Sequence, residues 1–222
     1  MRLLLVSLAM AWLTSAAAQI APPDRWEADI AAFEAADRNQ PPAPGGGVFI
    51  GSSSIRLWHT LQQDFPDTPI IQRGFGGSEI RDATRHAARI VLPYGPRLVV
   101  LYAGDNDLSQ GRTPEQVRDD FVAFVERVRR GLPDVAIAFI AIKPSPARAN
   151  LLDAARGANA PVEAYTKSRR AIRHADIFTP MLGGDGQPRR ELFGADALHL
   201  NRAGYGLWIT RIAPVLRELA PP

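Results

Sequence analysis

The sequence predicts an α/β domain of three layers, in which a doubly wound, mainly parallel sheet lies between two layers of helices. Short apolar runs typical of strands alternate along the chain with segments whose apolar residues recur at helical spacing. The strand-like runs are short and either rich in β-branched residues or fully apolar, as strands buried on both faces require. Because right-handed crossovers place helices on both faces of such a sheet, functional groups are expected at the carboxyl ends of its strands.

Composition narrows the classes of protein to which the chain can belong. Its 222 residues, 46% of them hydrophobic, suit one ordinary globular domain. The absence of cysteine excludes disulfides, thiolate metal sites and a cysteine nucleophile. The net charge is only +3, and acidic residues are interspersed with the arginines, so no nucleic-acid partner is expected. We also expect no cofactor and a monomeric state.

The first residues have the pattern of a signal peptide, predicted at 1–18. Arg2 supplies a positive start, residues 3–13 form a run that is apolar except at Ser7, and three alanines at 16–18 form a small-residue cleavage site. The apolar run of about 11 residues is shorter than the roughly 20 that a spanning helix needs, so we expect no stable membrane insertion after cleavage. The mature chain should begin near Gln19 and be exported, either to the periplasm or out of the cell.

An N-terminal helix and a linker are predicted at 19–46, ahead of the main domain at 47–222. The stretch DRWE at 24–27 has the form of a capping box, and apolar residues follow it at helical spacing. The Pro- and Gly-rich linker then reads QPPAPGGG.

Within the main domain, strands and helices are predicted to alternate. The strands are expected at 48–50, 69–71, 97–103, 135–142 and 176–178. The clearest helix is capped by Thr113 and Gln116 and ends at Gly131. The other helices are expected at about 54–63, 80–91, 160–174 and 202–219, and Pro214 should kink or shorten the last.

Three serines and a glycine follow the first predicted strand, in the stretch GSSS at 51–54. The glycine permits a sharp turn, and a serine at the start of the next helix would face the crevice. The helix dipole there favours a developing negative charge. The alternative is an ordinary helix cap and turn, which such serine-rich stretches commonly form.

The next two strand ends carry hydrogen-bond donors. The glycines of GFGGS at 74–78 can point backbone N–H groups into a concave site, and Asn106 in GDND at 104–107 offers a side-chain amide. Both kinds of donor suit a tetrahedral oxyanion. Tight turns and ordinary loop chemistry are the alternatives.

Asp196 precedes His199 by three residues near the C-terminus. In a turn, this spacing lets the carboxylate accept the ring N–H and fix the tautomer, which leaves the other ring nitrogen free to take a proton from a serine. A metal site through these two residues lacks an obvious third ligand, so we expect none. His59, His86 and His174 are interpreted as surface or packing residues.

Four stretches, in order, resemble the characteristic blocks of one superfamily. VFIGSSSIRLW, GFGGSEI, YAGDND and DALHLNRAGY look like blocks I, II, III and V of the SGNH (GDSL-like) serine hydrolases, and together they cover about 48–208. The resemblance implies the flavodoxin-like SGNH hydrolase fold, with Ser53 as nucleophile and Asp196 and His199 as its partners. It also implies an oxyanion hole formed by Ser53, Gly77 and Asn106.

Two neighbouring serines are less suitable as the nucleophile. Ser52 stands where the more familiar block I has aspartate, which makes GSSS a variant of that motif. Ser78 ends a second Gly-x-Ser sequence, but neither Ser78 nor Ser53 is followed by the glycine that would complete the nucleophile elbow of an α/β-hydrolase, and an Asp and a His only three residues apart also fit the SGNH pattern better than that fold.

The resemblance implies a serine esterase that hydrolyses a carboxylic ester, and we expect short acyl groups such as O-acetyl on a carbohydrate. The expected partner is therefore a small-molecule or glycan ester. Trp58, Lys143 and Arg148 are candidate substrate-binding residues, although Trp58 also fits the core and the other two a solvated loop. An O-acyltransferase, a lysophospholipase and a non-catalytic glycan- or lipid-binding domain are the alternatives on the same scaffold.

Overall fold

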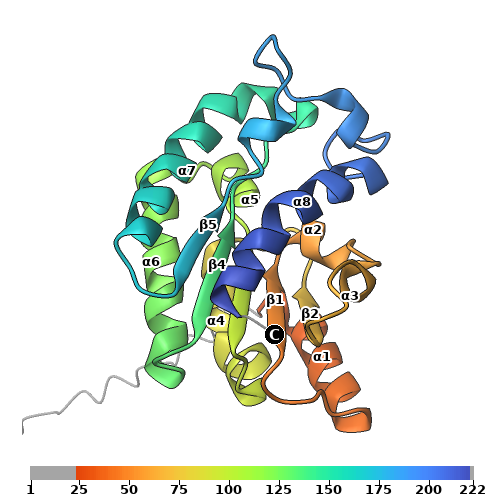
Figure 1. Cartoon of the computed structure of the whole chain (residues 1–222), viewed down its shortest axis with the longest axis vertical. Helices are drawn as coiled ribbons and strands as arrows, with labels where there is room; N and C mark the ends of the chain where they lie inside the picture. The colour runs from red at the N-terminus through yellow and green to blue at the C-terminus, as the bar shows by residue number, and fades with distance from the viewer. Residues whose placement is uncertain (1–23, 221–222) are drawn as a thin grey trace, which may run out of the picture.

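A five-stranded sheet forms the centre of the molecule, which the computed structural model describes over residues 24–220 (Figure 1). The strand order is β2-β1-β3-β4-β5, and every neighbouring pair is parallel. The strands are β1 (Gly47–Gly51), β2 (Ile70–Gly74), β3 (Leu98–Tyr102), β4 (Ala136–Ile140) and β5 (Ile172–Ala175). The predicted fold class is thereby confirmed, whereas the predicted signal peptide lies outside the described residues.

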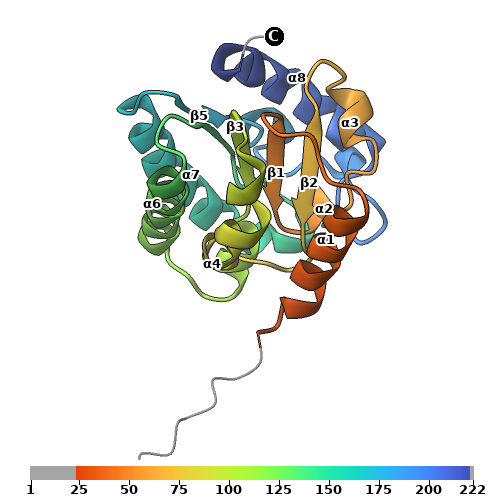
Figure 2. The ribbon, with the colours of Figure 1, turned by 90° about the horizontal axis from the view of Figure 1, so that it is seen from below.

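Helices cover both faces of this sheet. One face carries α1 (Glu27–Asn39), α4 (Ile80–Ile90), α6 (Pro114–Gly131) and α7 (Leu152–Lys167), and the other carries α2 (Ser53–Arg56), α3 (Leu61–Asp64) and α8 (Arg202–Leu219). Figure 2 shows α3 and α8 across the sheet from α4 and α6. The short helix α5 (Asp105–Ser109) follows β3, and short 3-10 helices lie at Leu92–Tyr94, Pro146–Leu151, Thr179–Met181 and Arg190–Leu192.

The handedness of the crossovers determines this division into layers. The chain steps from β1 to β2 in one direction and from β2 onward in the other, so right-handed crossovers place their helices on opposite faces. The direction reverses between β1 and β3. At this switch point the carboxyl ends of the strands open a crevice.

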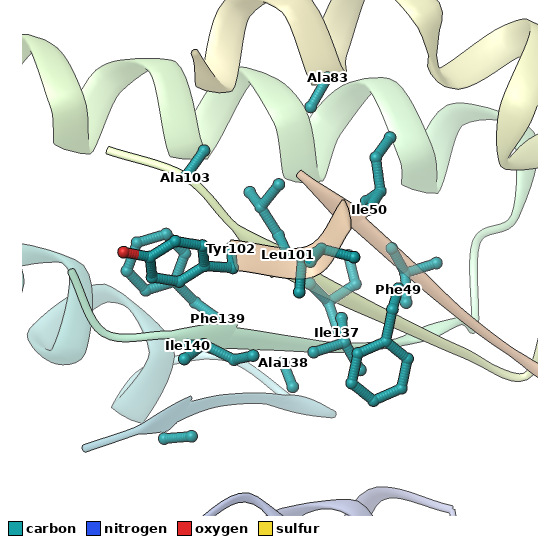
Figure 3. Close-up of a cluster of buried hydrophobic side chains, with 14 of the residues drawn as sticks. Phe49, Ile50, Ala83, Leu101, Tyr102, Ala103, Ile137, Ala138, Phe139 and Ile140 are labelled. Atoms are coloured by element: carbon teal, nitrogen blue, oxygen red, sulfur yellow. The ribbon is translucent and has the colours of Figure 1, made fainter. Parts of the chain in front are cut away.

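Strand side chains point alternately to the two helical layers and fill the core. All residues of β1, β3 and β4 are buried. Phe49 stacks on Phe65 with ring centroids 5.8 Å apart, and Tyr102 packs on Trp208 at 4.8 Å, both on the α8 side. On the opposite side, Figure 3 shows Ala83 of α4 facing the sheet. The sheet is therefore buried on both faces, as its apolar runs require.

Two predicted elements lie elsewhere along the chain. The fifth strand is not at 176–178 but at Ile172–Ala175, where Arg173 and His174 break the apolar pattern because β5 is an edge strand that is only half buried. The helix predicted at 160–174 is α7, which begins eight residues earlier and ends at Lys167. Ala171, whose φ of 54° is left-handed, lies between α7 and β5.

Two helix predictions are wrong in detail. The helix expected at 54–63 is divided into α2 and α3. Helix α1 starts at Glu27 without the capping box, because Asp24 accepts the N–H of Trp26 at 3.0 Å instead. Pro214, which was expected to kink or shorten α8, lies inside the helix on its exposed face and does not shorten it, since water can satisfy the carbonyl that it leaves free.

Helices α6 and α8 lie where they were predicted. The capping box of α6 forms between Thr113 and Gln116, and the helix ends at Gly131. Helix α8 occupies the predicted range from Arg202 to Leu219. No helix within residues 24–220 is both long enough and apolar enough to cross a membrane.

Helix α1 shares the core of the main domain. Ile30 is fully buried, and Trp26 belongs to the same cluster as the strand side chains. Arg89 of α4 binds Glu27 and Glu34 of α1, each with a closest N–O distance of 2.7 Å. Helix α1 and the strands therefore contribute to one hydrophobic core.

Substitution of Ile30 tests this shared core. Ile30→Ala should lower the free energy of unfolding by about 2–5 kcal/mol and keep a single transition, because it removes a fully buried side chain from the common core. The exposed neighbour substitution Ala31→Ser should cost less than about 1 kcal/mol. Urea unfolding followed by circular dichroism measures both, and equal small effects would mean that α1 is only an appendage.

Candidate active site

Ser53 begins α2 just beyond the carboxyl end of β1. Gly51 has a φ of 143°, and a Cβ there would lie 1.8 Å from the carbonyl oxygen of Tyr102 on β3. Only glycine allows the two strand ends to approach this closely. The N–H of Ser52 donates to the same carbonyl at 2.9 Å, which fixes the turn leading to Ser53.

The imidazole of His199 connects Ser53 to Asp196, although Ser53 and His199 are 146 residues apart in sequence. Its Nε2 lies 3.0 Å from Ser53 Oγ, and its Nδ1 lies 2.6 Å from Asp196 Oδ2. With the ring proton on Nδ1 donated to the carboxylate, Nε2 is free to accept the serine hydroxyl. The three side chains thus form one hydrogen-bonded chain.

The turn at 194–199 holds Asp196 in its ionised form. Its Oδ1 accepts the backbone N–H groups of Leu198 and His199, each at 3.0 Å. The His199 side chain is the largest cause of a strong lowering of the pKa of Asp196, and these two backbone donors add to it. A carboxylate that stays charged keeps the His199 ring in the orientation that faces Ser53.

The neighbouring serines differ from Ser53 in burial. Ser52, Ser54 and Ser78 are each at most 1% exposed, whereas Ser53 is partly exposed and is the serine in contact with His199. The crevice around it is open, because 31% of the His199 side chain and 51% of the Asp196 side chain are exposed.

Gly77 and Asn106 lie on two neighbouring segments that are joined by a hydrogen bond. Gly77 has a φ of 80°, in the region that favours glycine, and Asn106 belongs to α5. Asn106 Nδ2 donates to the carbonyl of Ser78 at 3.0 Å, which uses one of its two amide hydrogens. The second amide hydrogen is left for another acceptor.

Arg148 fixes the orientation of this amide. Its Nη2 donates to Asn106 Oδ1 at 2.9 Å, and its Nη1 lies 3.0 Å from Asp105 Oδ2. With Oδ1 occupied by the guanidinium, the Asn106 amide cannot exchange its oxygen and nitrogen positions without losing a charge-assisted hydrogen bond.

A buried ion pair lies beneath Asn106. Lys143 Nζ lies 2.6 Å from Asp105 Oδ2 and donates to the Tyr102 hydroxyl at 3.0 Å. Burial alone would raise the pKa of Asp105, but Lys143 and then Arg148 outweigh it and lower the pKa. The carboxylate is therefore charged and anchors both cations.

Two of the three candidate substrate-binding residues do not reach the crevice surface. Trp58 is fully buried, and its indole N–H donates to Asp64 at 2.7 Å. Lys143 is 3% exposed, because Asp105 draws its ammonium inward. Arg148 is partly exposed, but its guanidinium is bound to Asn106 and Asp105.

Asp107 is a site residue that the sequence reasoning did not identify. It is fully buried, and its Oδ1 accepts the N–H of Ile80 at 3.0 Å, so α5 holds the start of α4 beside the glycine loop. Burial is the main cause that raises the pKa of Asp107 to about 7. The signal in the sequence was a second aspartate in GDND, directly after a buried strand.

The arrangement suits acyl transfer. A hydroxyl linked to an imidazole and a carboxylate can be deprotonated as it attacks a carbonyl carbon, and nearby N–H groups can stabilise the resulting oxyanion. Within residues 24–220, no three histidine, aspartate or glutamate side chains are grouped as metal ligands.

One protein-family model matches most of the chain. The model of the GDSL-like lipase/acylhydrolase family matches residues 47–207. No curated protein sequence matches the chain.

Solved structures with the same fold cover most of the chain. A putative platelet-activating factor from Streptococcus pneumonia is 18% identical with a TM-score of 0.74, covering 86% of this chain and 91% of that one. A GDSL-like lipase from Bacteroides thetaiotaomicron is 20% identical with a TM-score of 0.74, covering 86% and 98%. A carbohydrate esterase of family 3 from Talaromyces cellulolyticus is 18% identical with a TM-score of 0.59, covering 78% and 97%.

Replacement of Asp107 tests its protonated state. Because its folded-state pKa of about 7 exceeds the ordinary value of 3.8, the native protein retains a proton that the unfolded chain loses, so stability falls as pH rises between those values. Asp107→Asn can still accept the Ile80 N–H but has no proton to lose. Its free energy of unfolding should therefore rise relative to that of wild type as the pH increases from about 4 to about 8, by on the order of 1–4 kcal/mol.

Urea unfolding at several pH values measures this difference. The exposed carboxyl of Asp67 supplies the matched control, and Asp67→Asn should follow the wild-type curve closely. A constant difference between Asp107→Asn and wild type across this range would show that Asp107 is already ionised in the native protein.

Proposed function

Because the chain belongs to the GDSL-like lipase/acylhydrolase family, we propose that it is an exported esterase that removes short acyl groups, such as O-acetyl, from carbohydrate. Family membership makes it a serine hydrolase acting on ester bonds. The observation that carries the proposal is the hydrogen-bonded chain from Asp196 through His199 to Ser53. Ser53 is the proposed nucleophile, His199 the base, and Asp196 the residue that orients it.

The reaction proceeds through an acyl-enzyme. His199 Nε2 takes the hydroxyl proton as Ser53 Oγ bonds to the ester carbonyl carbon, and the carbonyl π electrons move to oxygen. The resulting oxyanion accepts hydrogen bonds from the N–H groups of Ser53 and Gly77 and from the Asn106 amide. Collapse of the intermediate breaks the ester C–O bond, and the departing alcohol takes the proton from His199. Water then attacks the acyl carbon as His199 takes its proton, the bond to Ser53 Oγ breaks, and Ser53 regains its proton as the free acid is released.

Two observations support a short acyl group on a carbohydrate. His199 and Asp196 are partly open to solvent, and such a crevice suits a small acyl group on a larger carrier. The structurally similar protein from Talaromyces cellulolyticus is a carbohydrate esterase. The predicted signal peptide at 1–18 supports export, where glycan esters of the cell surface or surroundings are accessible.

Removal of the nucleophile is the first test of this proposal. Ser53→Ala should reduce hydrolysis of 4-nitrophenyl acetate to near background, a loss on the order of 10⁶, because no other group can form the acyl-enzyme. Ser52→Ala and Ser78→Ala serve as matched controls and should retain most activity, since both serines are buried. Substantial activity in Ser53→Ala would mean that another residue attacks the ester.

The substrate preference of the wild-type protein tests the proposed acyl group and carrier. Rates should fall as the acyl chain of 4-nitrophenyl esters lengthens, and acetylated glycan should release free acetic acid. Preference for long chains, or transfer of acetyl to added sugar in place of release, would contradict the proposed substrate or reaction.

Substitution of Asn106 and substitution of Arg148 should lower kcat to different extents. Asn106→Ala should lower kcat by about 10²–10³ because it removes an oxyanion donor. Arg148→Ala should lower kcat by roughly 3- to 30-fold with less change in KM, since the amide remains but loses its fixed orientation. Arg148→Lys should restore little, because one ammonium cannot replace the fork that binds Asn106 and Asp105.

The kinetic constants are measured beside urea unfolding, so that a loss of kcat can be separated from a loss of fold. Arg130→Ala removes an exposed arginine from the last turn of α6 and should change neither. An unchanged kcat in Arg148→Ala would show that its guanidinium is not needed to position the Asn106 amide.

A further inference from the structure

The segment that precedes α1 lies against the turn that carries Gly77. Trp26 packs edge-on against Phe75, with ring centroids 5.6 Å apart. A Cβ on Gly77 would lie 3.4 Å from the Trp26 ring and 3.4 Å from a guanidinium nitrogen of Arg25. Residues 25 and 26 therefore form one wall beside the proposed oxyanion donor.

Arg56 lies against the adjacent residue of the same turn. It is the last residue of α2, three positions after Ser53. A Cβ on Gly76 would lie 2.9 Å from the Cζ, the Nε and an Nη of its guanidinium, so the planar group rests over this glycine. Gly76 does not have a left-handed φ, and its missing side chain therefore serves the close approach of Arg56.

Neither guanidinium has an anionic partner within residues 24–220. Arg25 stacks on Trp26 at 4.5 Å from the ring centroid, and both arginine residues are exposed. Most other arginines near the N-terminal helix are paired, as Arg73 is with Asp37 and Arg89 with Glu27 and Glu34.

The nearby carboxylates are already bound to other groups. Asp24 lies 3.0 Å from Arg85 and 3.2 Å from His86 Nε2. Glu79 pairs with Arg81, and Asp196 binds His199. Two unneutralised cations consequently lie beside consecutive residues of the glycine turn, at the rim of the proposed catalytic centre.

We propose that Arg25 and Arg56 form an anion-binding site that recognises a carboxylate or phosphate group on the carrier of the ester. Guanidinium groups bind both anions through paired N–H donors. The substrate class is then an O-acylated acidic sugar, with the acyl group at Ser53 and the anionic group at the turn. This inference rests on the proposed esterase function and specifies its substrate further.

Matched esters test the site. The substrates are a methyl glucuronoside and a methyl glucoside that carry acetyl on the same hydroxyl, and an O-acetylated sugar phosphate. Wild-type kcat/KM should be about 10- to 50-fold higher for an anionic ester than for the neutral one, mainly through KM, and added salt should reduce this ratio. The glucuronoside and the phosphate distinguish which anion the site takes.

Variants at the two arginines should reduce the ratio of kcat/KM for the anionic ester to kcat/KM for the neutral ester. Arg25→Ala and Arg56→Ala should each lower it by about three- to tenfold, and the double variant should bring it close to one. Arg56→Lys should keep part of the preference, because it retains the charge without the paired donors. Arg130→Ala, in the last turn of α6 and so next to the amino end of β4, should leave the ratio unchanged.

A binding measurement separates this inference from the proposed function. Ser53→Ala should bind the uncleaved acetylated glucuronoside, and addition of Arg25→Ala and Arg56→Ala should weaken that binding by about tenfold or more. Hydrolysis of 4-nitrophenyl acetate without any preference for anionic esters would overturn the anion site and leave the esterase standing. Arginine-dependent binding without hydrolysis of any ester would overturn the esterase and leave the anion site standing.

Discussion

The close approach of Gly51 to the carbonyl oxygen of Tyr102 determines where the site can form. A side chain at residue 51 would collide with β3, so the glycine allows β1 to end directly against its neighbour at the switch point of the sheet. Ser53 therefore starts α2 close to the strand end from which α5 and Asn106 follow. The loop with His199, from the far end of the sequence, completes the hydrogen-bonded chain at this point.

Buried charge supports the donors around that serine. Asp105 binds Lys143 and Arg148, and Arg148 in turn holds the Asn106 oxygen, so the amide is oriented before any ligand arrives. Such preorganisation is how fixed dipoles stabilise a developing charge. The carboxylate of Asp196 is different, because it is half exposed and depends on the His199 ring and two backbone N–H groups for its hydrogen bonds.

The sequence could predict what depends on local pattern. Apolar runs located four of the five strands, and Thr113 with Gln116 located the start of α6, because burial on both faces and helix capping leave a mark on neighbouring residues. The edge strand β5 was misplaced because half-buried strands admit residues such as Arg173. The inward turn of Lys143 depends on Asp105, 38 residues away, and no local pattern records such a pairing.

The identity of the reactive side chain is the central claim, and a fluorophosphonate tests it most directly, because such reagents bond to an activated serine. Mass spectrometry of the labelled protein, with fragment ions that separate residues 52, 53 and 54, should find one adduct per chain, on Ser53. Prior replacement of His199 by alanine should prevent labelling. An adduct on Ser52, Ser54 or Ser78, or none on the intact protein, would contradict the assignment of Ser53 as the nucleophile.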